Sequence, residues 1–287
     1  MHFSITTVAL LLPIGTQSYH LYPNRISLEE NAEYVKDSDY YANIDSSAKD
    51  EVLKNSLTSL IFQHTTVSYD GVWTAFGDVD QSLIGYPCSS NLTYIPDIYS
   101  ATCWVPDKQV QPDANGECGA YKKEGDCFNR EHSWPKSWFG GFAKGQGAQT
   151  DLFLLFPSDG YVNGLRASLP LGNVDTSQEL RYTSTNGALI GQCKNFDGQC
   201  FEPGDVHKGD LARSYFYIAT AYDKQWDCCD NDGTNLANIK DWMEEDLRGW
   251  HTLDPVDDIE RARNEKIYGN WQHNRNPFID VSNMVSL

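Results

Sequence analysis

The chain has 287 residues, of which 40% are apolar and 22% are charged. This balance supports a sizeable buried core, excludes an intrinsically disordered chain and favours a single domain. The formal net charge of -18 at pH 7 opposes a nucleic-acid partner, because phosphate binding depends on Lys and Arg side chains that release counterions.

The N-terminus begins with an apolar stretch, MHFSITTVALLLP, that is far shorter than the roughly 20 residues needed to cross a bilayer. It fits a secretory signal peptide with cleavage near residues 16–18. The stretch lacks the Lys or Arg that usually precedes such an apolar core, which leaves a buried N-terminal strand as the alternative. The predicted organisation is a signal peptide over residues 1–18 and one domain over residues 19–287, in a secreted protein.

The first half of the remaining chain predicts one helix followed by loops. Apolar residues recur at helical spacing over residues 46–64, which indicates an amphipathic helix packed on a core. Residues 68–127 are rich in Gly, Pro, Asn and Asp and predict loops and short strands. Asn91 begins the glycosylation sequon NLT, which is consistent with export.

The centre of the chain, residues 129–172, alternates short apolar runs with turn residues. The run DLFLLF at residues 151–156 predicts a buried strand that ends at Pro157. A turn follows at residues 159–160, and a short helix is expected to begin near Val162 and to stop before Pro170.

Two further helices are predicted toward the C-terminus. Residues 210–222 are strongly apolar at helical spacing and indicate a central core helix, and a second helix is expected over residues 237–250. The run DNDG at residues 230–233 predicts a turn rather than a calcium loop, because the first and last ligand positions of such a loop would be Cys228 and Ile239. The tail from residue 261 to residue 287 ends in polar and loop-like residues.

The cysteines form an even set of eight without any C-x-x-C pair, which argues against a zinc ribbon and favours disulfides formed in an oxidising compartment. They are Cys88, Cys103, Cys118, Cys127, Cys193, Cys200, Cys228 and Cys229. Cys193 and Cys200 are close enough in sequence to close a short loop. Adjacent Cys228 and Cys229 are expected to reach separate partners.

Two motifs carry the strongest chemical signal, NREHSWPKSWF at residues 129–139 and DGYVNGLR at residues 159–166. This pair resembles the active site of the endonuclease I family, which belongs to the ββα-metal nucleases. The resemblance spans roughly residues 40–280 and continues in three further motifs, FEP at 201–203, KGDLARSYFY at 208–217 and NRNPF at 274–278. It implies a disulfide-stabilised α+β domain with helices, short strands and a ββα-metal motif. The implied activity is metal-dependent endonuclease hydrolysis of DNA and of RNA.

The chemistry of phosphodiester hydrolysis requires a base for water and a cation for the charge that develops on the phosphate. Histidine can take the proton of an attacking water when it is neutral and oriented through its other ring nitrogen, and we assign this role to His132. Because Mg²⁺ prefers oxygen ligands and keeps several waters, one carboxylate and one amide oxygen suffice. Glu131 and Asn163 are the predicted ligands; Mg²⁺ is the expected ion, with Ca²⁺ or Mn²⁺ as alternatives.

The neighbours Glu131 and His132 can serve one site only where the strand is irregular, because successive residues of a regular strand face opposite sides. A strand end or a bulge is therefore expected at Glu131. Arg166 lies one helical turn after Asn163 and is assigned a catalytic role, holding a substrate phosphate through two hydrogen bonds. A structural salt bridge is the alternative for Arg166.

The local charge around these motifs differs from the total charge. Residues 119–147 contain five basic residues against three acidic ones. With Arg166, these basic residues predict a positive approach to His132: Lys122, Lys123, Arg130, Lys136 and Lys144. The expected partners are DNA and RNA, and neither a membrane nor an obligate protein partner is indicated.

Two departures from the family pattern leave other functions open. Where the family has Asp-Leu-His-His/Asn-Leu, this chain reads DLFLL at residues 151–155, and Ala167 and Ser168 replace a frequent Ser-Asn pair. The proposed base and ligands are intact, so an active nuclease is expected. The alternatives are a catalytically silent nucleic-acid-binding module on the same fold and a structural secreted protein.

Overall fold

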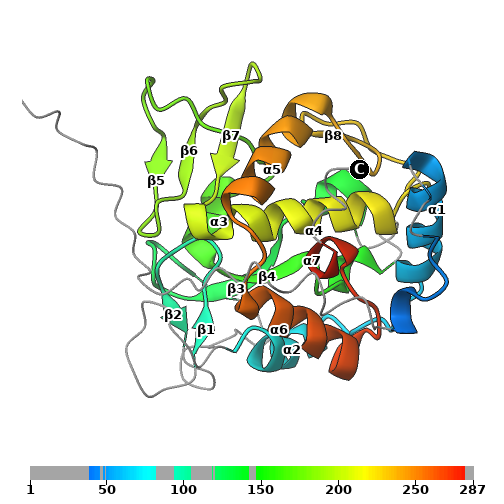
Figure 1. Cartoon of the computed structure of the whole chain (residues 1–287). Helices are drawn as coiled ribbons and strands as arrows, with labels where there is room; N and C mark the ends of the chain where they lie inside the picture. The colour runs from blue at the N-terminus through cyan, green and yellow to red at the C-terminus, as the bar shows by residue number, and fades with distance from the viewer. Residues whose placement is uncertain are drawn as a thin grey trace, which may run out of the picture.

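The computed structural model describes residues 39–45, 48, 50–81, 94–104, 118, 120–141 and 147–281. The predicted signal peptide, the sequon at Asn91 and the side chain of Lys144 lie outside these residues. The described residues form one mixed arrangement of helices and short antiparallel strands, which confirms the predicted α+β class (Figure 1).

The α-helices are α1 (Asp50–Ile61), α2 (Gly71–Val79), α3 (Gly160–Arg166), α4 (Lys208–Ala221), α5 (Asp241–Leu253), α6 (Asp258–Lys266) and α7 (Pro277–Asp280). The strands pair as β1 (Ile95–Pro96) with β2 (Cys103–Trp104), and as β3 (Phe128–His132) with β4 (Leu155–Asp159). A three-stranded sheet contains β5 (Tyr182–Thr183), β6 (Leu189–Gln192) and β7 (Gln199–Glu202), and a small hairpin contains β8 (Thr234–Asn235) and β9 (Asn238–Ile239).

The centre of the fold is α4, which crosses the molecule between α5 and the β3–β4 pair (Figure 1). Every residue of α4 except Asp210 and Ala219 is buried. A helix that is apolar on most sides is stable only when other elements surround it. The sequence prediction of a central core helix here is confirmed.

The β3–β4 pair is antiparallel and regular, with Glu131 opposite Phe156 and His132 opposite Leu155. The strand end or bulge expected at Glu131 is absent, because β3 continues to His132 and both residues pair regularly with β4. The helix expected near Val162 is α3, which begins two residues earlier, at Gly160.

The strand predicted at residues 151–156 is wrong in its position, because β4 covers Leu155–Asp159 and includes Pro157. The buried carboxylate of Asp151 explains the shift. It accepts a hydrogen bond from the backbone N–H of Phe153 at 2.9 Å, which bends the chain into a turn before the strand. Pro157 is tolerated because β4 has only one strand partner.

The helix predicted at residues 237–250 is α5, displaced toward the C-terminus. The residues that were expected to begin this helix belong instead to the β8–β9 hairpin. The side chain of Asn231 accepts the backbone N–H groups of Gly233 and Thr234 and forms a turn there. Three α-helices were not predicted from the sequence. One is α2, which lies within the stretch predicted as loops and short strands. The others are α6, most of which lies in the C-terminal tail, and α7, which lies wholly within it.

Disulfides join Cys118 to Cys127 and Cys193 to Cys200, and the second pair confirms the predicted short loop. Cys228 and Cys229 are joined to each other across a cis peptide bond, so the expectation of separate partners was wrong. Adjacent cysteines can form one small ring when the peptide between them is cis.

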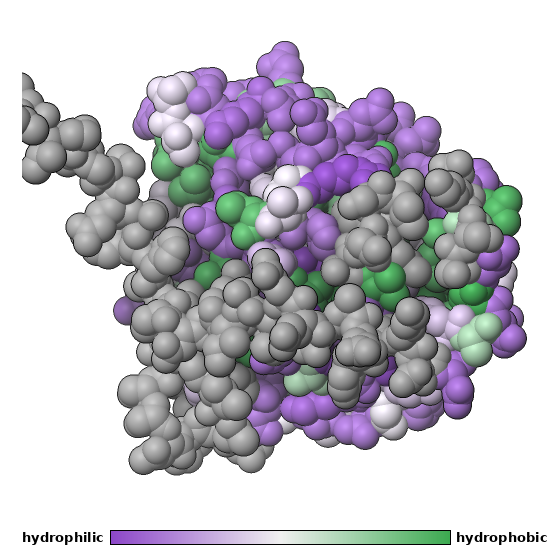
Figure 2. All heavy atoms as spheres, viewed as in Figure 1, coloured by the Kyte–Doolittle hydropathy of each residue, from purple (hydrophilic) through white to green (hydrophobic). Residues whose placement is uncertain are grey.

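The surface is largely hydrophilic on the face shown in Figure 2, with scattered hydrophobic residues between the polar ones. Within the part of the chain that the structure describes, the exposed large hydrophobic side chains are Val52, Leu253, Ile259 and Tyr268. Among the described residues, none of the helices is long and apolar enough to span a membrane.

Candidate active site

The β3–β4 hairpin leads directly into α3, because Asp159 ends the strand and caps the helix. Its Oδ1 accepts the backbone N–H groups of Tyr161 at 2.9 Å and Val162 at 3.0 Å. Its Oδ2 accepts the N–H of Gly125 at 2.6 Å, which ties the preceding loop to the same point. A side-chain cap satisfies the free N–H groups of a helix start and typically stabilises it by about 1 kcal/mol.

The predicted site residues lie where the sequence placed them, with Glu131 and His132 on β3 and Asn163 on α3. Glu131 is 3% exposed, and its Oε1 accepts hydrogen bonds from the Tyr99 hydroxyl at 2.9 Å and from Arg166 Nη1 at 2.6 Å. Burial raises the pKa of Glu131, while the positive charge of Arg166 opposes that increase.

Arg166 is wholly buried and donates to four groups in the interior. In addition to Glu131, its guanidinium reaches the backbone carbonyls of His132 at 3.1 Å and Ser133 at 2.6 Å, and the hydroxyl of Tyr215 at 3.3 Å. The structural salt bridge that the sequence left open for Arg166 is therefore the interaction present here. The predicted contact between this guanidinium and a substrate phosphate stays a prediction.

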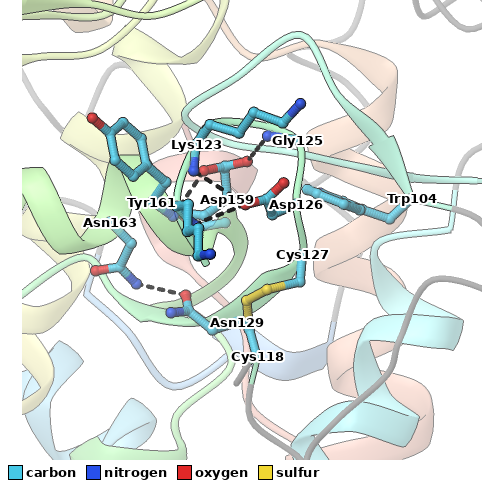
Figure 3. Close-up of a disulfide and its surroundings, with 12 residues drawn as sticks. Trp104, Cys118, Lys123, Gly125, Asp126, Cys127, Asn129, Asp159, Tyr161 and Asn163 are labelled. Atoms are coloured by element: carbon cyan, nitrogen blue, oxygen red, sulfur yellow. Dashed lines mark hydrogen bonds between the residues drawn. A yellow bond between two sulfur atoms is a disulfide. The ribbon is translucent and has the colours of Figure 1, made fainter. Parts of the chain in front are cut away.

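Asn163 is half-buried on α3, and its Nδ2 donates to Oδ1 of Asn129 on β3 at 2.7 Å. Figure 3 shows the two amides pointing toward each other, with the oxygen of Asn163 directed away from Asn129. The hydrogen bond thus joins the helix that carries one predicted ligand to the strand that carries the other.

His132 lies at the end of β3 and is 5% exposed. Its Nε2 lies 2.9 Å from the backbone carbonyl oxygen of Gln149. Its ring stacks against the ring of Tyr69, with the two ring centroids 6.3 Å apart. The pKa of His132 is lowered to about 3, mainly by burial and also by the charges of Lys136 and Arg130, against the opposing effect of the backbone carbonyls of Gln149 and Arg130. The imidazole is therefore neutral at pH 7. Because a neutral imidazole has one N–H, donation to Gln149 leaves the other nitrogen as a proton acceptor.

The basic residues predicted to line the approach to His132 divide into two groups. Arg130 is buried beside the ring of Tyr69, 3.5 Å from its centroid, and it donates to the Tyr69 carbonyl at 2.6 Å. Lys122 and Lys123 are exposed, and Lys136 is partly exposed. A positive approach built on the described residues therefore depends on the lysines and not on Arg130 or Arg166.

A loop closed by the Cys118–Cys127 disulfide packs on α3 (Figure 3). A Cβ atom added at Gly160 would lie 2.7 Å from the sulfur of Cys118, and one added at Gly164 would lie 2.7 Å from the hydroxyl of Tyr121. The two glycines therefore permit the close approach that fixes α3 against this loop.

The apolar residues that depart from the family pattern, Phe153 and Leu154, lie in the core. Their backbone carbonyls accept hydrogen bonds from the hydroxyls of Ser214 at 2.5 Å and Ser133 at 2.8 Å. The ring of Phe153 packs against that of Tyr217, with centroids 4.7 Å apart. The replacement therefore adds packing beneath the hairpin and leaves Glu131 and Asn163 in their elements.

Several residues of the site were not found from the sequence. Tyr99 and Tyr215 contact Glu131 and Arg166 from distant segments. Tyr99 lies in no motif, whereas Tyr215 lies inside the motif at residues 208–217, which gave it no role in the site. The carbonyl that orients His132 belongs to the backbone of Gln149, and a backbone group has no sequence signature. Asn129 lay inside the first motif and could have been considered on that ground.

The oxygen atoms suited to a hard cation fit the predicted pair. Glu131 Oε2 and Asn163 Oδ1 have no hydrogen-bond donor among the described residues, and both are types of oxygen that Mg²⁺ binds. In the same part of the chain, no three His, Cys, Asp or Glu side chains are grouped so that they could hold a metal ion. A site of one carboxylate and one amide needs no such group.

Comparisons with known proteins identify the family of the chain. Residues 50–283 match the family model described as endonuclease I. The chain is 34% identical over 253 residues to a protein of Bacillus subtilis (strain 168) named "Extracellular ribonuclease", an alignment that covers 87% of this chain and 77% of that protein. It is 31% identical over 249 residues to a protein of the same name from Bacillus amyloliquefaciens, with coverage of 85% and 76%. The chain therefore belongs to the endonuclease I family, and it is a secreted nuclease.

Proposed function

We propose that this nuclease hydrolyses phosphodiester bonds of both RNA and DNA, with His132 as the general base and one divalent cation bound by Glu131 and Asn163. The observation that carries the proposal is the β3–α3 unit. In this unit, β3 carries the neutral His132, whose ring contacts the Gln149 carbonyl, next in sequence to the buried Glu131, and the adjoining α3 carries Asn163, whose amide nitrogen donates to Asn129.

The base in this proposal is the imidazole nitrogen of His132 that does not donate to Gln149. Gln149 fixes the ring plane and the tautomer, and the low pKa keeps the ring neutral before it accepts a proton from water. Water attack at phosphorus then forms one P–O bond and breaks the bond to the leaving oxygen. That oxygen takes a proton from solvent, so a phosphate monoester and a hydroxyl remain.

Glu131 and Asn163 hold the cation through Oε2 and Oδ1, and Mg²⁺ is the first choice. When bound, the cation offsets the negative charge that develops on the phosphate oxygens. Arg166 has a positioning role in this scheme. It holds Glu131 Oε1 and the carbonyls that follow it in the chain, so the second carboxylate oxygen keeps a fixed direction.

The substrate range follows from the nucleophile. The relatives are named ribonucleases, which supports RNA as a substrate. A mechanism in which water attacks does not use the ribose 2′-hydroxyl, so DNA is expected to be cleaved as well. A mechanism in which the 2′-hydroxyl attacked would act on RNA alone and would produce a 2′,3′-cyclic phosphate.

The test is an assay of the full secreted chain on plasmid DNA and on single-stranded RNA, with Mg²⁺, Mn²⁺ or Ca²⁺ and then with EDTA. Cleavage of both substrates, loss of cleavage in EDTA and linear phosphate ends on RNA are expected. RNA cleavage that persists in EDTA and produces cyclic ends would exclude the proposed mechanism. Binding of either nucleic acid without cleavage would instead identify a catalytically silent module.

A further inference from the structure

The structure assigns a positioning role to Asn129, which we infer orients the Asn163 amide so that its oxygen is presented to the cation. The inference rests on the proposed function, because it requires Asn163 to be a ligand. Asn129 itself contributes no ligand in this assignment, since its Oδ1 accepts the Nδ2 of Asn163 at 2.7 Å.

The first support is the register between β3 and α3. Asn129 and Glu131 are two residues apart on a strand and share a face, while Asn163 and Arg166 are three apart on a helix and share a face. The four side chains meet in two matched pairs, Asn129 with Asn163 at 2.7 Å and Glu131 with Arg166 at 2.6 Å. Each predicted ligand therefore has one partner on the opposite element.

The second support is the geometry of the amide. A primary amide has a donor end and an acceptor end on one rigid plane. When the Nδ2 of Asn163 is held by Asn129, rotation about the last side-chain bond is restricted and Oδ1 points to the other side, as Figure 3 shows. Without that partner, the Asn163 amide can turn its nitrogen toward the cation, and an N–H group is no ligand.

The third support is that Asn129 is itself held in place. It pairs with Ser158 within the β3–β4 hairpin. Two residues earlier, Cys127 is joined to Cys118, and its backbone carbonyl accepts the N–H of Gly160 at 2.9 Å. These contacts fix the strand relative to the first residue of α3, so Asn129 can set the direction of the amide.

The test measures cation binding directly, with Mn²⁺ alone as the probe and free Mn²⁺ followed by electron paramagnetic resonance. It uses the full chain and the variants Asn163→Ala, Asn129→Leu and Asn129→Asp. Asn129→Leu preserves size but removes the acceptor and is expected to weaken Mn²⁺ binding roughly 10-fold, as for the loss of other groups that orient metal ligands. Asn129→Asp retains an acceptor for Nδ2 and is expected to bind Mn²⁺ with a Kd close to that of the parent.

A kcat measurement at saturating Mn²⁺ adds a second readout. Asn129→Leu should recover most of its kcat there, because the base His132 is untouched, whereas a general structural defect would not respond to the cation. Asn195→Leu is the matched control. It removes another side-chain amide, which donates to Asp246 at 3.0 Å, and should leave the Kd for Mn²⁺ unchanged.

The outcomes separate this inference from the proposed function. If Asn163→Ala weakens Mn²⁺ binding and Asn129→Leu does not, the role of Asn129 is overturned while the metal site stands. If neither variant changes the Kd, Asn163 is not a ligand and both fail. If Asn129→Leu does not fold, the Kd of Asn129→Asp for Mn²⁺ decides. If Asn129→Asp binds Mn²⁺ as weakly as Asn163→Ala does, an acceptor at position 129 does not orient the Asn163 amide, and the role of Asn129 is overturned.

Discussion

Nη1 of Arg166 lies 2.6 Å from Oε1 of Glu131, and both side chains are almost completely removed from water. Two opposite charges in the interior are tolerated because they pair with each other and with further hydrogen bonds. Tyr99 also donates to the same carboxylate oxygen, and the guanidinium also donates to the carbonyls of His132 and Ser133. The pair therefore connects the stability of the hairpin to the geometry of the site.

Replacement of Arg166 by Lys tests this connection. Lysine preserves the charge but cannot reach Glu131 and two carbonyls at once. We expect a loss of about 3 kcal/mol or more in the free energy of unfolding, together with weaker metal binding and a KM for substrate that changes little at saturating metal. Urea unfolding and metal titration of cleavage provide the measurements. Arg248→Lys, at an exposed pair with Glu244, is the control. A large increase in KM with unchanged metal affinity would return Arg166 to a phosphate-binding role.

The division between base and ligand predicts two different defects. His132→Ala should lower kcat by roughly 10²-fold or more while metal binding is largely retained, because a general base typically contributes that factor. Glu131→Gln should weaken metal binding and should be partly restored by excess cation. The discriminating measurement is a metal titration of cleavage by both variants. Rescue of His132→Ala and not of Glu131→Gln would exchange the two roles.

Stability should fall in mild acid because of His132. Its pKa is about 3 in the folded chain, compared with about 6.5 in an unfolded one, so the unfolded chain binds more protons between these values. The contribution of His132 to the free energy of unfolding is thus fully present above pH 6.5. It is lost as the pH falls toward 3, by at most about 1.4 kcal/mol per pH unit. Chemical unfolding of the parent and of His132→Gln between pH 7.5 and 4 should show a shallower loss in the variant. The control His273→Gln, at an exposed histidine, should lose stability with falling pH as steeply as the parent. If His132→Gln loses stability equally steeply, His132 is not held neutral by the fold.

Substrate binding should weaken as salt rises despite the net charge of -18. The double variant Lys122→Gln/Lys123→Gln removes two exposed charges from the loop beside α3. It should reduce the slope of log KM against log salt by up to about 0.9 for each duplex DNA phosphate that the lysines no longer neutralise. Lys224→Gln, at a surface ion pair with Glu51, is the control and should not alter the slope. A KM that is independent of salt would argue against a polyanionic substrate.

The elements that carry Glu131, His132 and Asn163 could be predicted because these residues lie in two motifs that resemble the endonuclease I family. The turn predicted at the Asp-Gly pair of residues 159–160 also indicated where the short helix follows. The helix α2 also had a local signal that was missed, since its buried residues recur at helical spacing: Val72, Ala75, Phe76 and Val79.

Other features depend on contacts that a single sequence does not display. Arg166 is charged, and charged side chains are usually exposed, so its complete burial follows only from Glu131 and Tyr215 meeting it in space. The helix α6 is mostly polar and is held through contacts such as Arg263 with Asp80, which lies far away in the sequence. Its one local signal was Asp257, which caps the helix by accepting the N–H of Glu260.

The two tyrosines that hold the Glu131–Arg166 pair limit how far this nuclease can be reduced in size. The segment from Phe128 to Arg166 contains the proposed base and both proposed metal ligands, which suggests that this segment could be transferred alone to another protein. Tyr99 comes from before that segment and Tyr215 from the central helix after it. A fragment or a graft of the hairpin and helix alone would leave the carboxylate and the guanidinium open to water, where each can adopt many directions. Activity in this fold therefore belongs to the whole domain, and attempts to transplant it need the surrounding core as well as the motif.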